Sequence, residues 1–191
     1  EQPRIIGWTA DSSRILFSEA RGTRTVIYEM PLDGPPRARF EPKRGVLNGI
    51  SLNTSGSTLG FQHETPDEAG EAYIMALDAA APVRVSAANA NLPKLPLGRT
   101  EVMRWKSKDG REVEGLVTYP VGYEKGKKYP LILNIHGGPT GVFNEGFIGK
   151  SGIYPLASFA ARGYVTLRPN PRGSSGYGRD FRFANYNDWG G

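Results

Sequence analysis

One short stretch has residue types that could support chemistry on an acyl group: His136-Gly137-Gly138-Pro139. It follows a mainly apolar run, 131–135, which predicts a strand buried on both faces and ending in a turn. Two adjacent glycines carry no Cβ, so the main chain can pass close to a reacting oxygen. A main-chain N–H placed there could stabilise the negative charge that develops in acyl transfer. The ends of strands are also where open α/β sheets build their sites.

A second stretch repeats this design further along the chain. An apolar strand up to Leu167 is followed by a loop that contains Asn170-Pro171-Arg172-Gly173-Ser174-Ser175-Gly176-Tyr177-Gly178. The carboxyl ends of two parallel strands would then lie at one rim of the sheet, with a glycine-rich loop after each. The glycines around Arg172 could suggest a phosphate-binding loop, but the Gly-x-x-x-x-Gly-Lys-Ser/Thr spacing does not occur. We expect a rigid loop beside the site, with Arg172 in a structural ion pair.

The other groups that acyl transfer needs are missing from the sequence. A nucleophile elbow, Gly-x-Ser-x-Gly, does not occur, because Ser151 and Ser175 have a glycine two residues before but none two residues after. His63 is expected in an exposed hairpin loop, and His136 is not expected to be a general base. No cysteine and no histidine cluster support a metal site. One segment expected to be a solvated loop holds four carboxylates, Glu64, Asp67, Glu68 and Glu71.

Strand and helix signals place both glycine-rich motifs in one parallel sheet. A helix is predicted over 154–162, with Pro155 in its first turn and Gly163 at its end, between the two apolar strands. A strand, a helix and a further strand form a crossover unit and imply parallel pairing. Before them, Asp109-Gly110 predicts a hairpin between strands at 101–106 and 112–119. Residues 89–99, with two prolines and no periodicity, form a linker.

The first hundred residues contain a repeat. Residues 8–17 align with 52–61 at an offset of 44, and residues 28–33 align with 73–78 at an offset of 45. A period near 45 is typical of a four-stranded propeller blade, which buries its faces by stacking on neighbours. Two repeats cannot close a ring, so further blades are expected before residue 1 or in a larger assembly. An open β-sandwich is the alternative architecture.

The two glycine-rich motifs, preceded by propeller-like repeats, resemble the prolyl oligopeptidase family of serine peptidases, and most closely its acylaminoacyl-peptidase and dipeptidyl-aminopeptidase branch. The resemblance implies C-terminal β-propeller blades in residues 1–98 and the N-terminal part of an α/β-hydrolase catalytic domain in residues 99–191. It implies hydrolysis of short peptides near the amino end through an acyl-enzyme, without a cofactor. It assigns Gly138, Gly137 and His136 to the oxyanion turn, with the Gly138 N–H as donor and His136 shaping the turn through hydrogen bonds.

One departure from the family pattern bears on the branch. Prolyl oligopeptidases and the fourth type of dipeptidyl peptidase have a tyrosine at the position of His136, and its hydroxyl is an oxyanion donor. The acylaminoacyl branch uses backbone donors and therefore fits better. The resemblance places the catalytic serine, aspartate and histidine beyond Gly191, in the remainder of the same enzyme, which would also supply the missing blades. This chain alone is expected to be inactive.

Composition limits the other function classes. With 38% hydrophobic and 23% charged residues, the chain is globular rather than disordered. Its net charge is +5, but no lysine-arginine run is interleaved with aromatic residues, so a nucleic-acid partner is not expected. The longest uncharged stretch, 129–144, is shorter than the roughly 20 apolar residues of a membrane span.

Several questions stay open at the level of sequence. The start at Glu1, without an initiator methionine or signal pattern, suggests an interior fragment. The cytoplasm and the periplasm are both left open as compartments, and so is a homo-oligomer. Two other functions remain: an α/β-hydrolase esterase acting on small esters, and a catalytically inactive propeller-containing binding protein.

Overall fold

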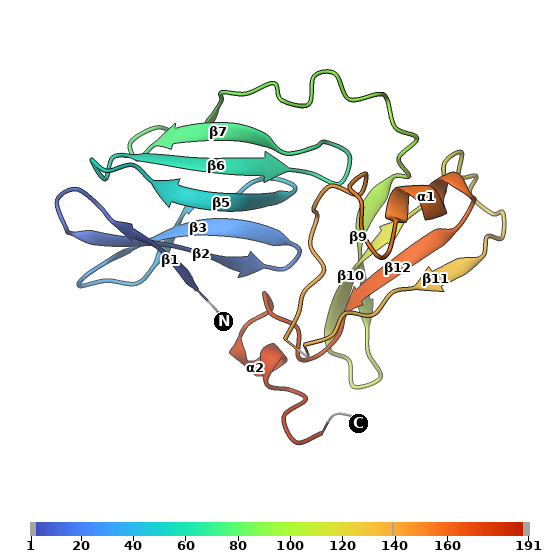
Figure 1. The fold of residues 1–191 in the computed structure, drawn as a ribbon. Coiled ribbons are helices and arrows are strands. Elements are labelled where there is room, and N and C mark those ends of the chain that lie inside the picture. The colour runs from blue at the N-terminus through green and yellow to red at the C-terminus, as the bar shows by residue number, and fades with distance from the viewer. Residues whose placement is uncertain (1–2, 139, 189–191) are drawn as a thin grey trace.

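The computed structural model describes residues 3–138 and 140–188, which form three four-stranded sheets and two short helices (Figure 1). The first sheet contains β1 (Arg4–Trp8), β2 (Arg14–Arg21), β3 (Arg24–Pro31) and β4 (Arg37–Phe40). The second contains β5 (Val46–Leu52), β6 (Thr58–Glu64), β7 (Glu71–Ala76) and β8 (Val83–Arg84). Both are antiparallel meanders in chain order. The repeat seen in the sequence is therefore one four-stranded sheet, used twice.

The turn before the second strand of each sheet has the same construction. In the first sheet, Asp11 Oδ1 accepts a hydrogen bond from the N–H of Ser13 at 3.1 Å. In the second, Asn53 Oδ1 accepts hydrogen bonds from the N–H groups of Ser57 and Thr58 at 2.9 and 3.0 Å. Short polar side chains that bond to the backbone a few residues ahead are the usual means of fixing such turns. Local sequence thus determines where each apolar strand begins.

The two repeated sheets share one hydrophobic core. Its buried members come from both sheets, and three of them, Leu16, Ile27 and Leu59, are 0% exposed. Complete burial of such a side chain contributes about 1.5–3 kcal/mol. The full cluster is Leu16, Ile27, Leu47, Leu59, Phe61 and Met75. Each sheet therefore depends on its neighbour to cover its apolar face.

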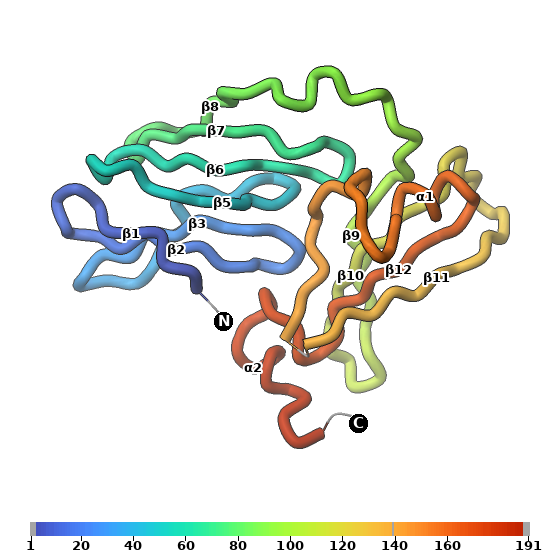
Figure 2. The backbone as a smooth tube through the Cα atoms, in the orientation of Figure 1, coloured from blue at the N-terminus to red at the C-terminus, as the bar shows by residue number. Residues whose placement is uncertain are grey.

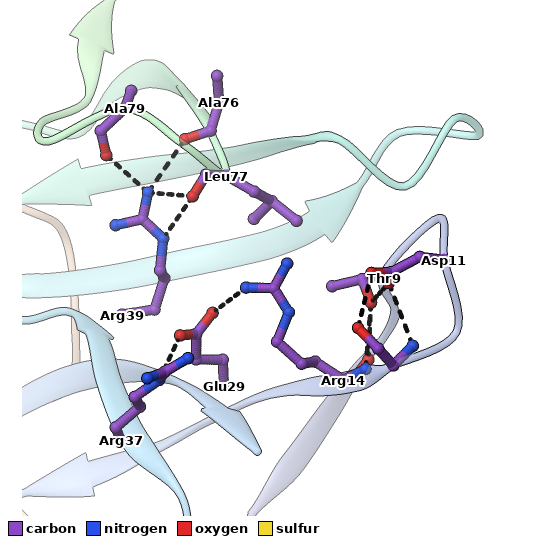
Figure 3. Close-up of polar contacts among 10 residues, drawn as sticks. Thr9, Asp11, Arg14, Glu29, Arg37, Arg39, Ala76, Leu77 and Ala79 are labelled. Carbon is purple, nitrogen blue, oxygen red and sulfur yellow. Dashed lines mark hydrogen bonds and ion pairs between the residues drawn. The ribbon is translucent and has the colours of Figure 1, made fainter. Parts of the chain in front are cut away.

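An arginine at the edge of the first sheet ties it to the second (Figure 3). Arg39 of β4 donates from Nε to the carbonyl oxygen of Leu77 at 2.8 Å and from Nη2 to that of Ala79 at 2.6 Å, just beyond the end of β7. A guanidinium has five donors in a rigid fork, so one side chain can satisfy several exposed carbonyl groups. These hydrogen bonds add to the shared hydrophobic core in holding the first sheet against the second.

The third sheet has the order β11-β12-β10-β9. Its strands are β9 (Thr100–Lys106), β10 (Glu112–Thr118), β11 (Leu131–Leu133) and β12 (Val165–Asn170), and the helices are α1 (Leu156–Ala161) and α2 (Arg179–Arg182). The predicted Asp109-Gly110 hairpin joins β9 to β10, and β11 pairs parallel to β12 across α1, as predicted. Gly163 ends α1 at φ +84°, and its N–H donates to Ala160 at 3.2 Å. None of the described helices has the length and apolar character to cross a membrane.

The prediction of a strand buried on both faces before the Gly-Gly turn is wrong for this chain. Leu131 and Leu133 of β11 are 58% and 54% exposed, and Ile135 is 64% exposed. The reason is position: β11 is the edge strand of the third sheet, and within the described residues no helix covers these side chains. An apolar run reports a preference for burial, not the presence of a covering layer.

The segment 143–150 runs between the third sheet and the repeated sheets (Figure 2). The N–H of Glu145 donates to the carbonyl oxygen of Thr23 at 2.9 Å, and that of Ile148 donates to Pro66 at 3.1 Å. Further along, Lys150 Nζ lies 3.1 Å from Glu64 Oε1. Residues 89–99 contain neither helix nor strand, consistent with the predicted linker. Segment 143–150 therefore supplies contacts to both repeated sheets.

Two predictions about the second sheet are wrong. His63 does not lie in an exposed loop: it belongs to β6, its Nε2 is 2.9 Å from the carbonyl oxygen of Arg44, and its ring contacts Tyr73. Glu64 and Glu71 are buried rather than solvated, at 8% and 5% exposure, whereas Asp67 and Glu68 are exposed as expected.

The burial of Glu71 is compensated by hydrogen bonds from the chain that follows β8. Ser86 donates its hydroxyl to the carboxylate, and the N–H groups of Asn89 and Ala88 donate at 2.9 and 3.0 Å. The Ser86 hydrogen bond, followed by that from Asn89, lowers the pKa of Glu71 to about 2. A buried carboxylate is tolerated when several donors stabilise its charged form.

Candidate functional site

The parallel pairing of β11 and β12 brings the two glycine-rich loops to the same edge of the third sheet. The register pairs Leu131 with Val165 and Leu133 with Leu167, and the N–H of Asn134 extends the ladder to the carbonyl oxygen of Leu167 at 2.9 Å. Both strands then end within three residues of a glycine-rich motif. The carboxyl ends of parallel strands meet at one edge, which is why the predicted common rim forms.

His136 joins the two loops. Its Nε2 lies 3.0 Å from Ser174 Oγ, and its Nδ1 lies 3.1 Å from the carbonyl oxygen of Gly137. Ser174 Oγ donates its single proton to the carbonyl oxygen of Pro171 at 2.6 Å, so we assign the proton between His136 and Ser174 to Nε2. The imidazole also packs edge-on against Phe143, with ring centroids 5.1 Å apart. The hydrogen bond to Ser174 and the contact with Phe143 fix the orientation of the ring.

The pairing of Ser174 with His136 has the composition of a nucleophile and a base, but not the geometry of one. Ser174 is 0% exposed, and its proton points to a main-chain carbonyl. A substrate carbonyl cannot reach a hydroxyl in that position. The ring nitrogens of His63 and His136 contact main-chain carbonyls and a buried hydroxyl, and neither histidine pairs with a carboxylate among the residues that the structure describes. Those residues therefore hold no accessible Ser-His-Asp arrangement of the kind used in acyl transfer.

The two glycines of the turn differ in what they require. Gly138 has φ +133°, and a Cβ there would lie 2.7 Å from the main-chain nitrogen of Gly141, so this position demands glycine. Gly137 has no positive φ, and a Cβ built on it meets no described atom within 4 Å. Space at Gly137 is therefore open on the side where a side chain would project. Pro139, the last residue of the motif, lies outside the described residues.

A cavity of about 910 Å³ opens against the turn. Gly137 and Gly138 form part of its wall, together with the β9–β10 hairpin and the chain around α2. Arg172 and Asp109 also line the cavity and form an ion pair with each other, as predicted for a structural arginine. The N–H of Arg111 and then the charge of Arg172 lower the pKa of Asp109, so this carboxylate stays ionised. The residues lining the cavity also include Arg111, Pro171, Asp180, Ala184, Asn185 and Asp188.

Asn170 and Tyr177 have individual roles that the sequence pattern does not indicate. Asn170 is 0% exposed, and its Nδ2 donates to the Tyr177 hydroxyl at 2.9 Å. That hydroxyl donates in turn to Glu114 Oε1 at 2.9 Å, and burial raises the pKa of Tyr177. Arg104 completes the series with an ion pair to Glu114 Oε2 at 2.7 Å. The only sequence signal for these roles is the motif 170–178, because Glu114 and Arg104 are far from it in the sequence.

Comparison with known proteins agrees with this arrangement. The model of the prolyl oligopeptidase family matches residues 153–191. Dipeptidyl-peptidase 5 of Aspergillus fumigatus is 28% identical over 99% of this chain and 26% of its own length, and the peptidase YuxL of Bacillus subtilis is 30% identical over 96% and 27%. The solved structure of Pyrococcus horikoshii acylaminoacyl peptidase superposes with a TM-score of 0.72, at 25% identity, over 90% of this chain and 26% of that one.

The extent of these matches defines what they establish. The chain spans about a quarter of the length of the curated relatives it matches. Within that quarter, both relatives align with nearly the whole chain, the repeated sheets included, and the structural match covers most of it. The resemblance to the prolyl oligopeptidase family, peptidase family S9, that the two glycine-rich motifs indicate is thereby confirmed.

Proposed function

We propose that this chain is part of a serine peptidase that hydrolyses short peptides near their amino end, with Gly138 supplying an oxyanion donor. Residues 1–98 form the last blades of a β-propeller and residues 99–191 the first part of an α/β-hydrolase domain. The catalytic serine, aspartate and histidine belong to the remainder of the enzyme. The observation that carries the proposal is the turn at Gly137-Gly138, which opens onto a cavity at the carboxyl ends of two parallel strands.

The reaction would proceed in two acyl-transfer steps. A serine from the remainder of the enzyme attacks the peptide carbonyl, and the oxygen of the resulting tetrahedral intermediate accepts a hydrogen bond from the Gly138 N–H. The intermediate collapses to an acyl-enzyme with loss of the amine, and water then releases the acyl group in the same manner. None of the hydrogen bonds between described residues uses the Gly138 N–H as donor, which supports this role. No cofactor is required by this chemistry.

The relatives support a substrate with an accessible amino end. One is named a dipeptidyl-peptidase and another an acylaminoacyl peptidase. The backbone character of the donor, with histidine rather than tyrosine at position 136, favours the acylaminoacyl type. A propeller built by repeating the two four-stranded sheets would admit short peptides and exclude folded proteins.

A substrate panel tests this proposal on the intact protein. Acetyl-alanyl-4-nitroanilide, alanyl-alanyl-4-nitroanilide and 4-nitrophenyl acetate present an acylated amino end, a free dipeptide and a simple ester. We expect hydrolysis of at least one of the two anilides, with the acetylated one preferred by about tenfold or more in kcat/KM, a difference of about 1.4 kcal/mol. Hydrolysis of the ester alone would identify an esterase, and no hydrolysis of any of the three would favour an inactive binding protein.

A further inference from the structure

The loop 170–177 holds the chain on the far side of Gly138 by hydrogen bonds to main-chain groups. Ser175 Oγ donates to the carbonyl oxygen of Thr140 at 2.7 Å, and the N–H of Ser175 donates to that of Gly141 at 3.3 Å. Ser175 is only 8% exposed. One residue therefore contacts the carbonyl groups of two consecutive residues just after the oxyanion turn.

Asn170 holds the same segment one step further along. Its Oδ1 accepts from the N–H of Phe143 at 2.7 Å, and its Nδ2 donates to the carbonyl oxygen of Phe143 at 2.9 Å. A carboxamide that accepts and donates at one residue is satisfied in a single orientation. Because Asn170 is 0% exposed, water cannot replace either bond without opening the loop.

These contacts are anchored in the third sheet rather than in another loop. Asn170 is the last residue of β12, and its Nδ2 also reaches Tyr177, which is bonded to Glu114 of β10. The first sheet adds a further contact, because the N–H of Gly22 donates to the carbonyl oxygen of Gly176 at 2.7 Å. The loop 170–177 is thus fixed at both ends.

The oxyanion turn needs such support because glycine restrains it least. Two consecutive glycines have the widest choice of backbone conformations, so their own sequence does not fix the direction of the Gly138 N–H. A donor stabilises a developing oxyanion fully only when its direction is set before the reaction. Ser174 fixes His136 before the turn, whereas Ser175 and Asn170 fix residues 140–143 after it.

We propose that Ser175 and Asn170 are positioning residues that set the direction of the Gly138 N–H. They touch no substrate and act through the main chain of residues 140–143. The inference rests on the proposed peptidase function and assigns a role to residues outside the oxyanion turn itself.

The test compares Ser175→Ala with Thr118→Val in the intact protein. Thr118 is 0% exposed and its hydroxyl lies 2.9 Å from that of Thr100, so both variants lose one buried hydroxyl hydrogen bond. Thr118 pairs with Thr166, near the start of β12, whereas the loop 170–177 begins at the end of that strand. We expect Ser175→Ala to lower kcat about tenfold with KM within twofold, and to weaken binding of a peptide aldehyde, which forms an oxyanion adduct, by the same factor. Thr118→Val should keep the wild-type kcat.

Asn170→Asp provides a second variant, because a carboxylate keeps the shape but cannot donate to Phe143 or Tyr177. It should lower kcat further than Ser175→Ala does.

Amide hydrogen exchange gives a readout that does not need catalysis: exchange in residues 136–143 should accelerate in Ser175→Ala and not in Thr118→Val. If the wild type cleaves no peptide, the function fails but the exchange result still decides the positioning role. Wild-type exchange and wild-type kcat in a folded Ser175→Ala protein would overturn the inference.

Discussion

Replacing Gly137 by alanine is expected to lower kcat/KM of the intact protein on the order of 100-fold without measurable loss of stability. In the fold, a Cβ at Gly137 meets no described atom within 4 Å, and this residue has no positive φ to strain. Gly137 and Gly138 both line the cavity, so under the proposed function the added methyl group would lie beside the Gly138 N–H, where the acyl oxygen of the substrate would approach. The substitution should therefore lower activity and leave stability unchanged. Steady-state kinetics and thermal unfolding measure the two effects.

Gly152→Ala is the matched control. Gly152 also has open space around its Cβ position and no positive φ, but it does not line the cavity. It should keep both activity and melting temperature. Gly138→Ala should lose both, because φ +133° and the 2.7 Å approach to Gly141 strain the backbone as well. Full activity in Gly137→Ala would show that no substrate group approaches this turn.

Leu16→Ala is expected to lower the free energy of unfolding of the repeated sheets by about 3–5 kcal/mol. Leu16 is 0% exposed and belongs to the cluster formed by residues of both sheets. Its truncation leaves a cavity that neither sheet can fill by moving alone. Because the core is shared, amide protection should fall in β6 and β7 of the second sheet as well as in β2 and β3. Native-state hydrogen exchange resolves the two sheets.

Leu32→Ala serves as the comparison, since Leu32 lies in the turn just after β3 and is 69% exposed. Its effect should stay within about 0.5 kcal/mol, as is usual for surface substitutions. If Leu16→Ala removes protection from the first sheet and leaves the second unchanged, the two sheets are independent units. The stacking of blade-like repeats would then be the wrong description of residues 1–98.

The parts of the fold that sequence analysis predicted are those with local causes. The repeat, the Asp109-Gly110 hairpin, the end of α1 at Gly163 and the parallel pairing of β11 with β12 all depend on short stretches with clear periodicity or turn chemistry. The position of the Gly-Gly motif after a strand also follows from local pattern. Each of these signals is complete within a few neighbouring residues.

The errors concern residues whose surroundings come from distant segments. Glu64 is paired with Lys150, and Glu71 is bonded by Ser86 and by the residues after it, so a run of carboxylates that looked solvated is half buried. Asn170 accepts a hydrogen bond from Phe143, which belongs to a different loop. The exposure of β11 has the opposite cause, since its apolar side chains lack a covering layer in the described chain. Such environments depend on tertiary contacts that no local pattern encodes.

The most direct test of the account is to treat the intact protein with a fluorophosphonate probe and locate the modified residue by mass spectrometry. Such a probe reacts with a serine activated by a neighbouring base. We predict a single labelled serine outside residues 1–191, with labelling slowed in Gly137→Ala, because the phosphonyl oxygen would use the same donor. A label on a serine within residues 1–191, or no label on a folded protein, would contradict it.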